Sequence, residues 1–259
     1  NRGIRIIQLN GIAYVWKQQG SSSLHGPQNH RIMRLFRELA ELIHPDTILL
    51  PETHAINMEN RSYLGKNYEQ GHMIHQLSLP LLLLHALLKG NAQQLSAWAR
   101  QVPDPGHEAT YFNFTASHQG IGIWPAAEMI PRHDMDQVVE KMKAFGGYIS
   151  TKTLADGSDI PYEVNITFFD ALKGTFHGED SLQTERFLCS QTIMMSLRGI
   201  PGFYIHSLTA TKNDHKGVQQ TGKSKNINRK KWDWKELMNR LSDEKHPAHK
   251  VFHELKRLM

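Results

Sequence analysis

The sequence predicts an α/β fold that forms part of a (β/α)8 barrel. Apolar segments with strand character alternate about five times with segments whose apolar residues recur at helical spacing, which is typical of a parallel sheet with crossover helices. A doubly wound sheet would give the same alternation. Long polar loops follow the strands, however, and a barrel builds its active site from such loops. About five strands do not close a barrel of eight and would leave two unpaired edges, so we expect further strands from a longer parent chain or a partner.

The N-terminal segment predicts a strand, a helix and a second strand, joined as a parallel crossover. Residues 3–9 are rich in Ile and fit a buried parallel strand. Asn29 is a candidate cap for the helix that ends at Ile43. Residues 47–50 predict a second buried strand, and Glu52 stands where this strand ends.

The later elements are separated by turn-forming residues, and 57–71 is expected to be a long polar loop. Strands are expected over 73–77, 111–115 and 203–207, and a hairpin is expected from 148–153 and 162–168. Helices are expected over 79–88, 95–101, 135–145 and 182–197, and in the tail around 235–241 and 247–258.

Composition favours a soluble protein of the reducing cytoplasm. The 259 residues are 39% hydrophobic, and the Leu-rich run 79–88 is too short to span a membrane. No signal or transit segment opens the sequence, so we expect no membrane association. A single cysteine, Cys189, excludes a disulfide framework and a thiolate metal cluster, and no histidine pair with a neighbouring acid predicts a metal site.

The formal charge of +5 comes largely from the last part of the chain. Its basic loop contains Lys223, Lys225, Arg229, Lys230 and Lys231. Such a loop can bind an anion or a nucleic acid. Elsewhere basic residues alternate with acidic ones, and no aromatic-basic recognition motif is present. We therefore expect no nucleic-acid partner, and expect the loop to line the mouth of the barrel near a phosphate site.

Polar side chains stand at the ends of three predicted strands: Asn10, Glu52 and Gln119. Such groups suit a sugar or phosphate site, and Glu52, flanked by apolar residues, is a candidate general acid. Retaining glycosyl transfer needs two carboxylates, one as acid/base and one as nucleophile. Asn10 and Gln119 can hydrogen-bond a sugar, but they cannot attack an anomeric carbon or hold negative charge beside it.

The surrounding segments resemble motifs of glycoside hydrolase family 13, the α-amylase superfamily, and in detail its sucrose phosphorylase and glucosylglycerate phosphorylase-like branch. The similar segments are 6–17 (the fourth-strand motif), 49–54 (the fifth-strand motif), 114–122 (the seventh-strand motif), 156–165 (the mobile acceptor and phosphate loop), and 199–206 with 212–229 (the eighth-strand region). The resemblance implies a barrel fragment of about strands four to eight. It divides the chain into 1–128 for strands four to seven, 129–175 for an excursion with the acceptor-type loop, and 176–259 for the last unit and C-terminal helices. The N-terminal half of the barrel and the C-terminal β-domain are expected to be absent.

The resemblance also implies roles for single residues. Glu52 corresponds to the acid/base, Asn10 to the nucleophile position, and Gln119 to the transition-state Asp of a His–Asp pair. Gln8 stands where an Arg is expected. The substitutions at positions 8, 10 and 119 each remove a charge. Without a carboxylate at position 10, no other group would form the covalent intermediate. We therefore expect the chain to be inactive or impaired.

The substrate contacts that the resemblance implies are Gln8, His118, Asp159, Tyr162, Glu163 and Arg229. Taken alone, His118, Tyr162 and Arg229 would also fit a loop His, a core Tyr and a surface Arg. Glu163 favours a glucosylglycerate-type acceptor. The implied activity is retaining α-glucosyl transfer between a sucrose- or glucosylglycerate-type donor and inorganic phosphate, with phosphate as co-substrate and no further cofactor. A catalytically dead sugar-binding remnant and an α-glucoside hydrolase or transglucosidase are the alternatives. The oligomeric state is not predicted.

Overall fold

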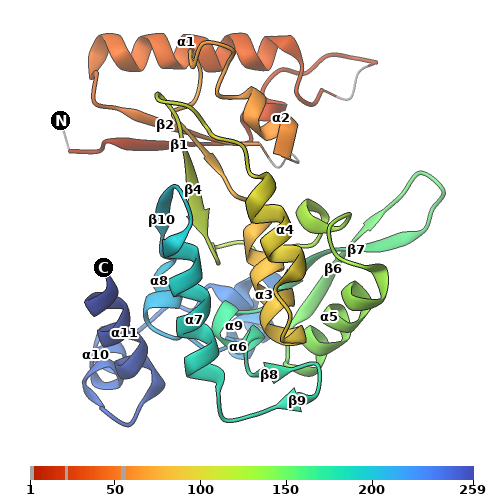
Figure 1. Ribbon diagram of the computed structural model, residues 1–259, viewed down its shortest axis with the longest axis vertical. Helices are drawn as coiled ribbons and strands as arrows, with labels where there is room; N and C mark the ends of the chain where they lie inside the picture. Colours follow the sequence, from red (N-terminus) through yellow and green to blue (C-terminus); the bar gives the residue numbers. More distant parts are fainter. Residues whose placement is uncertain (1–2, 21–22, 54–56) are drawn as a thin grey trace. The chain divides into compact units, whose positions relative to one another are not determined.

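The computed structural model describes residues 3–20, 23–53 and 57–259, and packing divides the chain into two compact units (Figure 1). Unit 1 consists of Asn1–Leu77, Pro103–Asn113 and Arg198–Ile200. Unit 2 consists of Ser78–Val102, Phe114–Leu197 and Pro201–Met259. His54, the last residue of the segment that resembles the fifth-strand motif, lies outside the described residues.

Unit 1 contains the predicted strand–helix–strand crossover. Strands β1 (Ile6–Asn10) and β2 (Ile48–Glu52) are parallel neighbours, and helix α1 (Pro27–Ile43) connects them. Strand β3 (Met73–His75) is parallel to β4 (Thr110–Phe114), and β10 (Ile200–Gly202) lies on the other side of β4. The expected loop at 57–71 includes a short helix, α2 (Asn57–Ser62).

A small apolar core lies under α1 in unit 1, formed by Ile12, Ala13, Met33, Leu49 and Tyr63. Pro27 begins α1 and Gly26 is its N-cap, so the prediction that Asn29 caps this helix is wrong. Proline suits the first helical position because that position needs no N–H. The buried Asn29 side chain instead donates to Ala13 O at 2.7 Å and accepts from Trp16 N at 2.8 Å. It fixes the turn η1 (Ile12–Tyr14) that follows β1.

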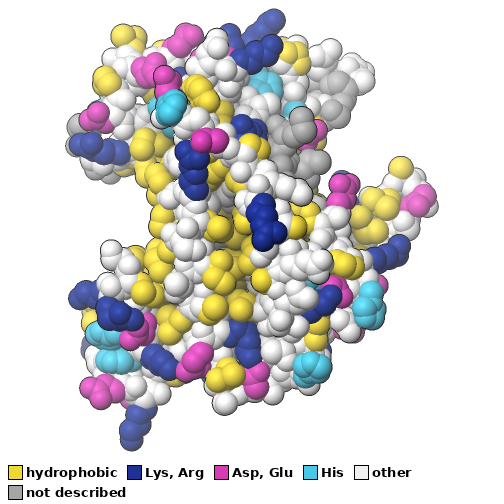
Figure 2. Space-filling view, in the orientation of Figure 1, with side chains coloured by type: hydrophobic (Ala, Val, Ile, Leu, Met, Phe, Trp, Pro, Cys, Tyr) yellow, Lys and Arg dark blue, Asp and Glu magenta, His cyan; other side chains and the backbone are white. Residues whose placement is uncertain are grey.

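Strand β1 is exposed, which contradicts the prediction of a buried strand. Ile6 and Ile7 are 50% and 41% exposed. The physical reason is that, among the described residues, β1 has only β2 as a neighbouring strand. Near the end of α1, Leu42 and Ile43 are 81% and 78% exposed. In the space-filling view, hydrophobic side chains reach the surface over α1 between charged ones (Figure 2).

The last strand lies at β10 and not at 203–207, where helix α8 (Ile205–Leu208) forms instead. Gly199 explains this shift. Its φ is +136°, and a Cβ at this position would lie 2.6 Å from Tyr111 O. A glycine therefore allows the chain to approach β4 closely at this point, directly before β10.

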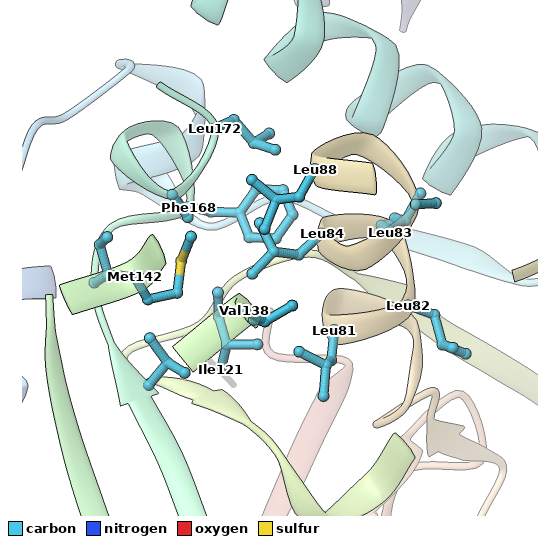
Figure 3. Close-up of a cluster of buried hydrophobic side chains, with 14 of the residues drawn as sticks. Leu81, Leu82, Leu83, Leu84, Leu88, Ile121, Val138, Met142, Phe168 and Leu172 are labelled. Atoms are coloured by element: carbon cyan, nitrogen blue, oxygen red, sulfur yellow. The ribbon is translucent and has the colours of Figure 1, made fainter. Parts of the chain in front are cut away.

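Unit 2 is organised around the Leu-rich helix α3 (Leu79–Lys89), which was predicted over 79–88 and ends at Gly90 in the left-handed conformation. In Figure 3, Leu84 and Leu88 lie beside Phe168, while Leu82 and Leu83 point to another side of the helix. All five side chains are buried. The helix is apolar all round because it has packing partners on more than one side. Its neighbours include α4 (Gln93–Gln101), α5 (Arg132–Ala144) and α7 (Gln183–Ser196).

The predicted hairpin is present as β6 (Tyr148–Thr153) and β7 (Asp159–Asn165), and β5 (Ile121–Gly122) adds a third antiparallel strand to it. The predicted tail helices are present as α10 (Trp234–Ser242) and α11 (Pro247–Leu258). Unit 2 also contains η2 (Trp124–Ala126), α6 (Phe168–Ala171), β8 (Gly174–Thr175), β9 (Gly178–Glu179), α9 (His215–Thr221) and η3 (Ser224–Asn228). Across the described part of the chain, no helix has both the length and the apolar character that crossing a bilayer requires.

Candidate functional site

In unit 1, the ends of β1 and β2 bring Gln8, Asn10 and Glu52 together. Asn10 and Glu52 are partners in the parallel register. Gln8 precedes Asn10 by two residues, so both side chains leave the same face of β1. The Gln8 Nε2 group donates to Glu52 Oε2 at 2.6 Å and to Asn10 Oδ1 at 2.9 Å. One amide therefore joins the Glu52 carboxylate to the Asn10 side chain.

Of the three side chains of Gln8, Asn10 and Glu52, only that of Glu52 is buried. It is 8% exposed, whereas Gln8 and Asn10 are exposed. Gln8 is a neutral donor and interacts with the carboxylate less strongly than a charged guanidinium would. Asn10 carries no carboxylate, and its oxygen accepts a bond from Gln8. The arrangement therefore holds one buried carboxylate beside two neutral amides.

The end of β2 is fixed by residues that the sequence did not single out. Thr53 Oγ1 donates to Asn60 Oδ1 at 2.9 Å, and Asn60 Nδ2 donates to His75 O at 2.8 Å. Both Thr53 and Asn60 are buried. Asn60 thus connects the residue after Glu52 to the end of β3. Its place in a polar segment gave no signal of this role.

In unit 2, the loop 117–120 that follows β4 carries His118 and Gln119. His118 is exposed and Gln119 is half-buried. Arg229 Nε donates to His118 O at 2.7 Å. Asn228 Nδ2 donates to Ser117 O at 2.6 Å and to Gln119 O at 3.0 Å. Arg229, which was predicted to contact a sugar, binds the backbone of this loop, and Asn228 is a further contact of the loop that was not predicted.

The predicted substrate contacts of the hairpin lie along β7 in different environments. Glu163 is buried, accepts from Gly120 N at 2.9 Å and pairs with Lys225 at 3.1 Å. Tyr162 stacks on Trp124, with ring centroids 6.5 Å apart. Asp159 is exposed at the start of the strand and accepts from Thr153 Oγ1 at 2.6 Å.

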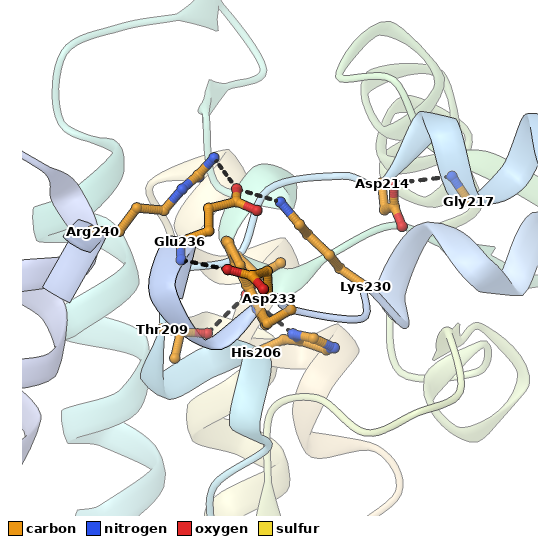
Figure 4. A network of polar contacts seen from close by, with 10 residues as sticks. His206, Thr209, Asp214, Gly217, Lys230, Asp233, Glu236 and Arg240 are labelled. Atoms are coloured by element: carbon orange, nitrogen blue, oxygen red, sulfur yellow. Dashed lines mark hydrogen bonds and ion pairs between the residues drawn. The ribbon is translucent and has the colours of Figure 1, made fainter. Parts of the chain in front are cut away.

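Several charges of the basic loop have partners within unit 2. Lys230 Nζ lies 3.1 Å from Glu236 Oε1 and 3.8 Å from the centre of the Trp232 ring. Arg240 contacts the same carboxylate at 2.8 Å, so the three charged side chains form one network (Figure 4). Together with the Lys225–Glu163 pair, these contacts neutralise part of the charge that was expected to serve an anion.

Among the described residues, no group of three or more His, Cys, Asp or Glu side chains could hold a metal ion. His249 and His253 are four residues apart on α11, and their ring centroids are 4.2 Å apart. The Nδ1 atom of His249 is engaged with Leu241 O at 2.8 Å. This pair lacks a third ligand among the described residues.

Parallel strands joined by helices, with polar side chains at the strand ends, are typical of α/β proteins, a class that includes the (β/α)8 barrels. No family model matches the chain. It is 36% identical over 258 residues to the glucosylglycerate phosphorylase of Escherichia coli, covering 100% of this chain and 46% of that protein. It is 38% identical over 243 residues to the glucosylglycerate phosphorylase of Spirochaeta thermophila, covering 94% of this chain and 41% of that protein.

The crystal structure of sucrose 6F-phosphate phosphorylase from Thermoanaerobacter thermosaccharolyticum matches the fold with a TM-score of 0.81 at 23% identity, over 99% of this chain and 48% of that one. This match confirms that the chain has the fold of part of an α/β barrel. The chain spans less than half the length of the relatives it matches. It is related, over its whole length, to the phosphorylases of the sucrose-phosphorylase branch of glycoside hydrolase family 13.

Proposed function

We propose that the chain carries part of the site of a glycoside phosphorylase, which transfers an α-glucosyl group between a glucosylglycerate-type donor and phosphate with retention. The observation that carries the proposal is the register pair Asn10 and Glu52, bridged by Gln8 at 2.9 and 2.6 Å. Sequence relatedness to glucosylglycerate phosphorylases over the whole chain supports the choice of donor. The single cysteine suits a cytoplasmic location.

In this proposal, Glu52 donates a proton to the oxygen of the leaving group. The side chain at position 10 would attack the anomeric carbon, and phosphate would then displace the sugar from the resulting ester. His118, Gln119, Tyr162 and Arg229 would contact the sugar. Asn10 cannot form that ester, because a neutral amide lacks the required nucleophilic oxygen. We therefore propose that turnover in this chain is impaired by about 10⁴-fold or more.

The second candidate is a sugar-binding protein without catalysis, and the pair of amides at Asn10 and Gln119 favours it. Both amides can donate to and accept from sugar hydroxyl groups. A hydrolase or transglucosidase is a further alternative within the enzyme class. It would differ from a phosphorylase in its product, since water or a sugar would replace phosphate as acceptor.

The test uses a chimera in which the parts of the Escherichia coli relative that this chain does not span complete the chain. The measured quantity is glucose 1-phosphate released from glucosylglycerate, and separately from sucrose, in the presence of phosphate. The chimera with its own Asn10 and Gln119 is expected to release no more than its Glu52→Gln variant. The double reversion Asn10→Asp with Gln119→Asp is expected to restore phosphate-dependent release. Circular dichroism and the melting temperature confirm that the chimeras fold.

Release by the chimera without reversion would show that Asn10 does not prevent turnover. A folded double reversion that stays inert beside an active Escherichia coli enzyme would overturn the roles given to positions 10 and 119. Retained binding of glucosylglycerate without turnover in both chimeras would favour the sugar-binding candidate. Glucose released without phosphate would favour a hydrolase.

A further inference from the structure

The backbone of the loop 117–120 is held by two consecutive side chains at the end of η3. The single Nδ2 group of Asn228 donates to the carbonyls of Ser117 and Gln119, at 2.6 and 3.0 Å. Arg229 Nε donates to the intervening carbonyl of His118 at 2.7 Å. Three successive carbonyls of the loop thus accept hydrogen bonds from residues more than a hundred positions away in sequence.

The other side of the loop is held by β7. Gly120 N–H donates to Glu163 Oε1 at 2.9 Å, and a Cβ on Gly120 would lie 2.4 Å from Val164 O. Glu163 is buried, and its second oxygen pairs with Lys225 of η3 at 3.1 Å. The loop therefore lies between η3 and β7, and the Lys225–Glu163 pair connects these two elements.

Asn228 is itself firmly anchored. Its carbonyl accepts from Tyr204 Oη at 2.9 Å, and the neighbouring Ile227 O accepts from Asp214 N at 2.9 Å. Ile227 is fully buried and Asn228 is 4% exposed. On either side of η3, Asp214 caps α9 and Lys230 pairs with Glu236, as Figure 4 shows. The segment that holds the loop is fixed at both ends.

We propose that Asn228 and Glu163 are positioning residues that fix the backbone of 117–120 and thereby orient the side chains of His118 and Gln119 toward a sugar. The inference rests on the proposed function for its ligand, but its structural part does not. The amide of Asn228 is suited to this role because it donates, whereas a carboxylate would only accept and would face two carbonyl oxygens. A loop ordered before binding avoids the entropy cost of ordering on binding.

The test compares Asn228→Asp with Asn226→Asp in the 259-residue chain. Asn226 lies in the same 3-10 helix, but its Nδ2 donates to Thr221 Oγ1 at 2.8 Å and not to the loop. The first readout is amide hydrogen exchange of Gln119 and Gly120, measured by NMR. Asn228→Asp removes the two hydrogen bonds from the side chain of Asn228 to the loop, and this loss is expected to accelerate the exchange by about tenfold. Asn226→Asp is expected to leave it unchanged.

A second pair of variants separates positioning from general stability. Glu163→Gln keeps an oxygen that accepts from Gly120 N–H, whereas Glu163→Leu does not. Exchange of the Gly120 amide is therefore expected to stay slow in Glu163→Gln and to rise in Glu163→Leu. Calorimetric titration with glucosylglycerate is expected to show weaker binding in Asn228→Asp than in Asn226→Asp.

Unchanged loop exchange in Asn228→Asp, or equal exchange in the two Glu163 variants, would overturn the proposal. If Asn228→Asp unfolds and raises exchange throughout unit 2, the comparison of Gly120 exchange between Glu163→Gln and Glu163→Leu tests the proposal instead. If the exchange pattern is as expected but the unmodified chain does not bind glucosylglycerate, the proposed ligand is contradicted. The fixing of the loop 117–120 by Asn228 and Glu163 would still stand. Normal glucosylglycerate binding in Asn228→Asp, together with accelerated exchange of the loop, would overturn the proposal that Asn228 orients His118 and Gln119.

Discussion

Gln8 donates one amide group to two neighbours, Glu52 and Asn10. An arginine at this position would add a positive charge and further donors in a rigid plane. Glutamine keeps a short contact with the carboxylate, at 2.6 Å, but stabilises its charge less. The neutral donor Gln8 thus contacts a neutral acceptor at Asn10 and a carboxylate at Glu52.

A single residue, His72, is expected to make the stability of the protein depend on pH. Its Nδ1 accepts from Leu49 N at 3.0 Å, which requires an unprotonated nitrogen. Burial, reinforced by the Arg37 charge and opposed by Glu41, lowers the pKa of His72 to about 4. Between pH 6.5 and about 4 the unfolded chain binds a proton at this site and the folded chain does not. The free energy of unfolding is therefore expected to fall as pH is lowered through this window.

The measurement is urea unfolding at pH 7 and pH 5, with His72→Asn as the control. Asn can accept from Leu49 N–H and does not titrate, so it removes this contribution alone. His25, His206 and His246 also have lowered pKa values because of burial, so only the difference between the two proteins reports on His72. The wild type is expected to lose about 1 kcal/mol more than the variant, after allowance for solvent screening. Parallel pH profiles would contradict this assignment.

At the scale of elements, patterns in the sequence predicted the crossover of β1, α1 and β2, the Leu-rich helix α3 and the hairpin of β6 and β7. These patterns are local, because strand and helix periods repeat within a few residues. The last strand was misplaced, since Gly199, Ile200, Pro201 and Gly202 have the composition of a turn. Its position depends on the approach of Gly199 to β4, a contact across a long separation in sequence.

Gly199→Ala is expected to destabilise the protein more than Gly222→Ala. The Gly199 φ of +136° is unfavourable for an L-residue, and the new methyl group would lie 2.6 Å from Tyr111 O. Gly222 has a φ of +66°, but a Cβ there would meet nothing within 4 Å. We expect a loss of about 3 kcal/mol at position 199 and about 1 kcal/mol at position 222, measured by chemical unfolding. Equal losses would mean that the close approach at β4 contributes nothing.

At the scale of the whole molecule, apolar side chains are exposed on β1 and α1 of unit 1. Larger apolar patches at a surface favour association. Leu35, Phe36, Leu39, Leu42 and Ile43 are all exposed on α1. Among the described residues, nothing covers this apolar face.

The 259-residue chain is therefore expected to self-associate at increasing concentration. Leu42→Lys with Ile43→Lys places two charges on this face and is expected to weaken association about tenfold, measured by sedimentation velocity. Gln219→Lys with Gln220→Lys is the matched control, because it adds the same charge at exposed polar positions of α9. If both double variants reduce association equally, net charge and not the apolar face is responsible.

The sequence by itself determined the alternation of strands and helices, the location of Glu52 at a strand end and the amides at positions 10 and 119. These follow from residue identity and short-range periodicity. Only the tertiary structure decided that Gln8 bridges Asn10 and Glu52, that β1 is exposed, and that Asn228 and Glu163 hold the loop of His118 and Gln119. Those outcomes depend on contacts between segments far apart in the chain, where a donor and an acceptor meet only after packing has fixed their distance.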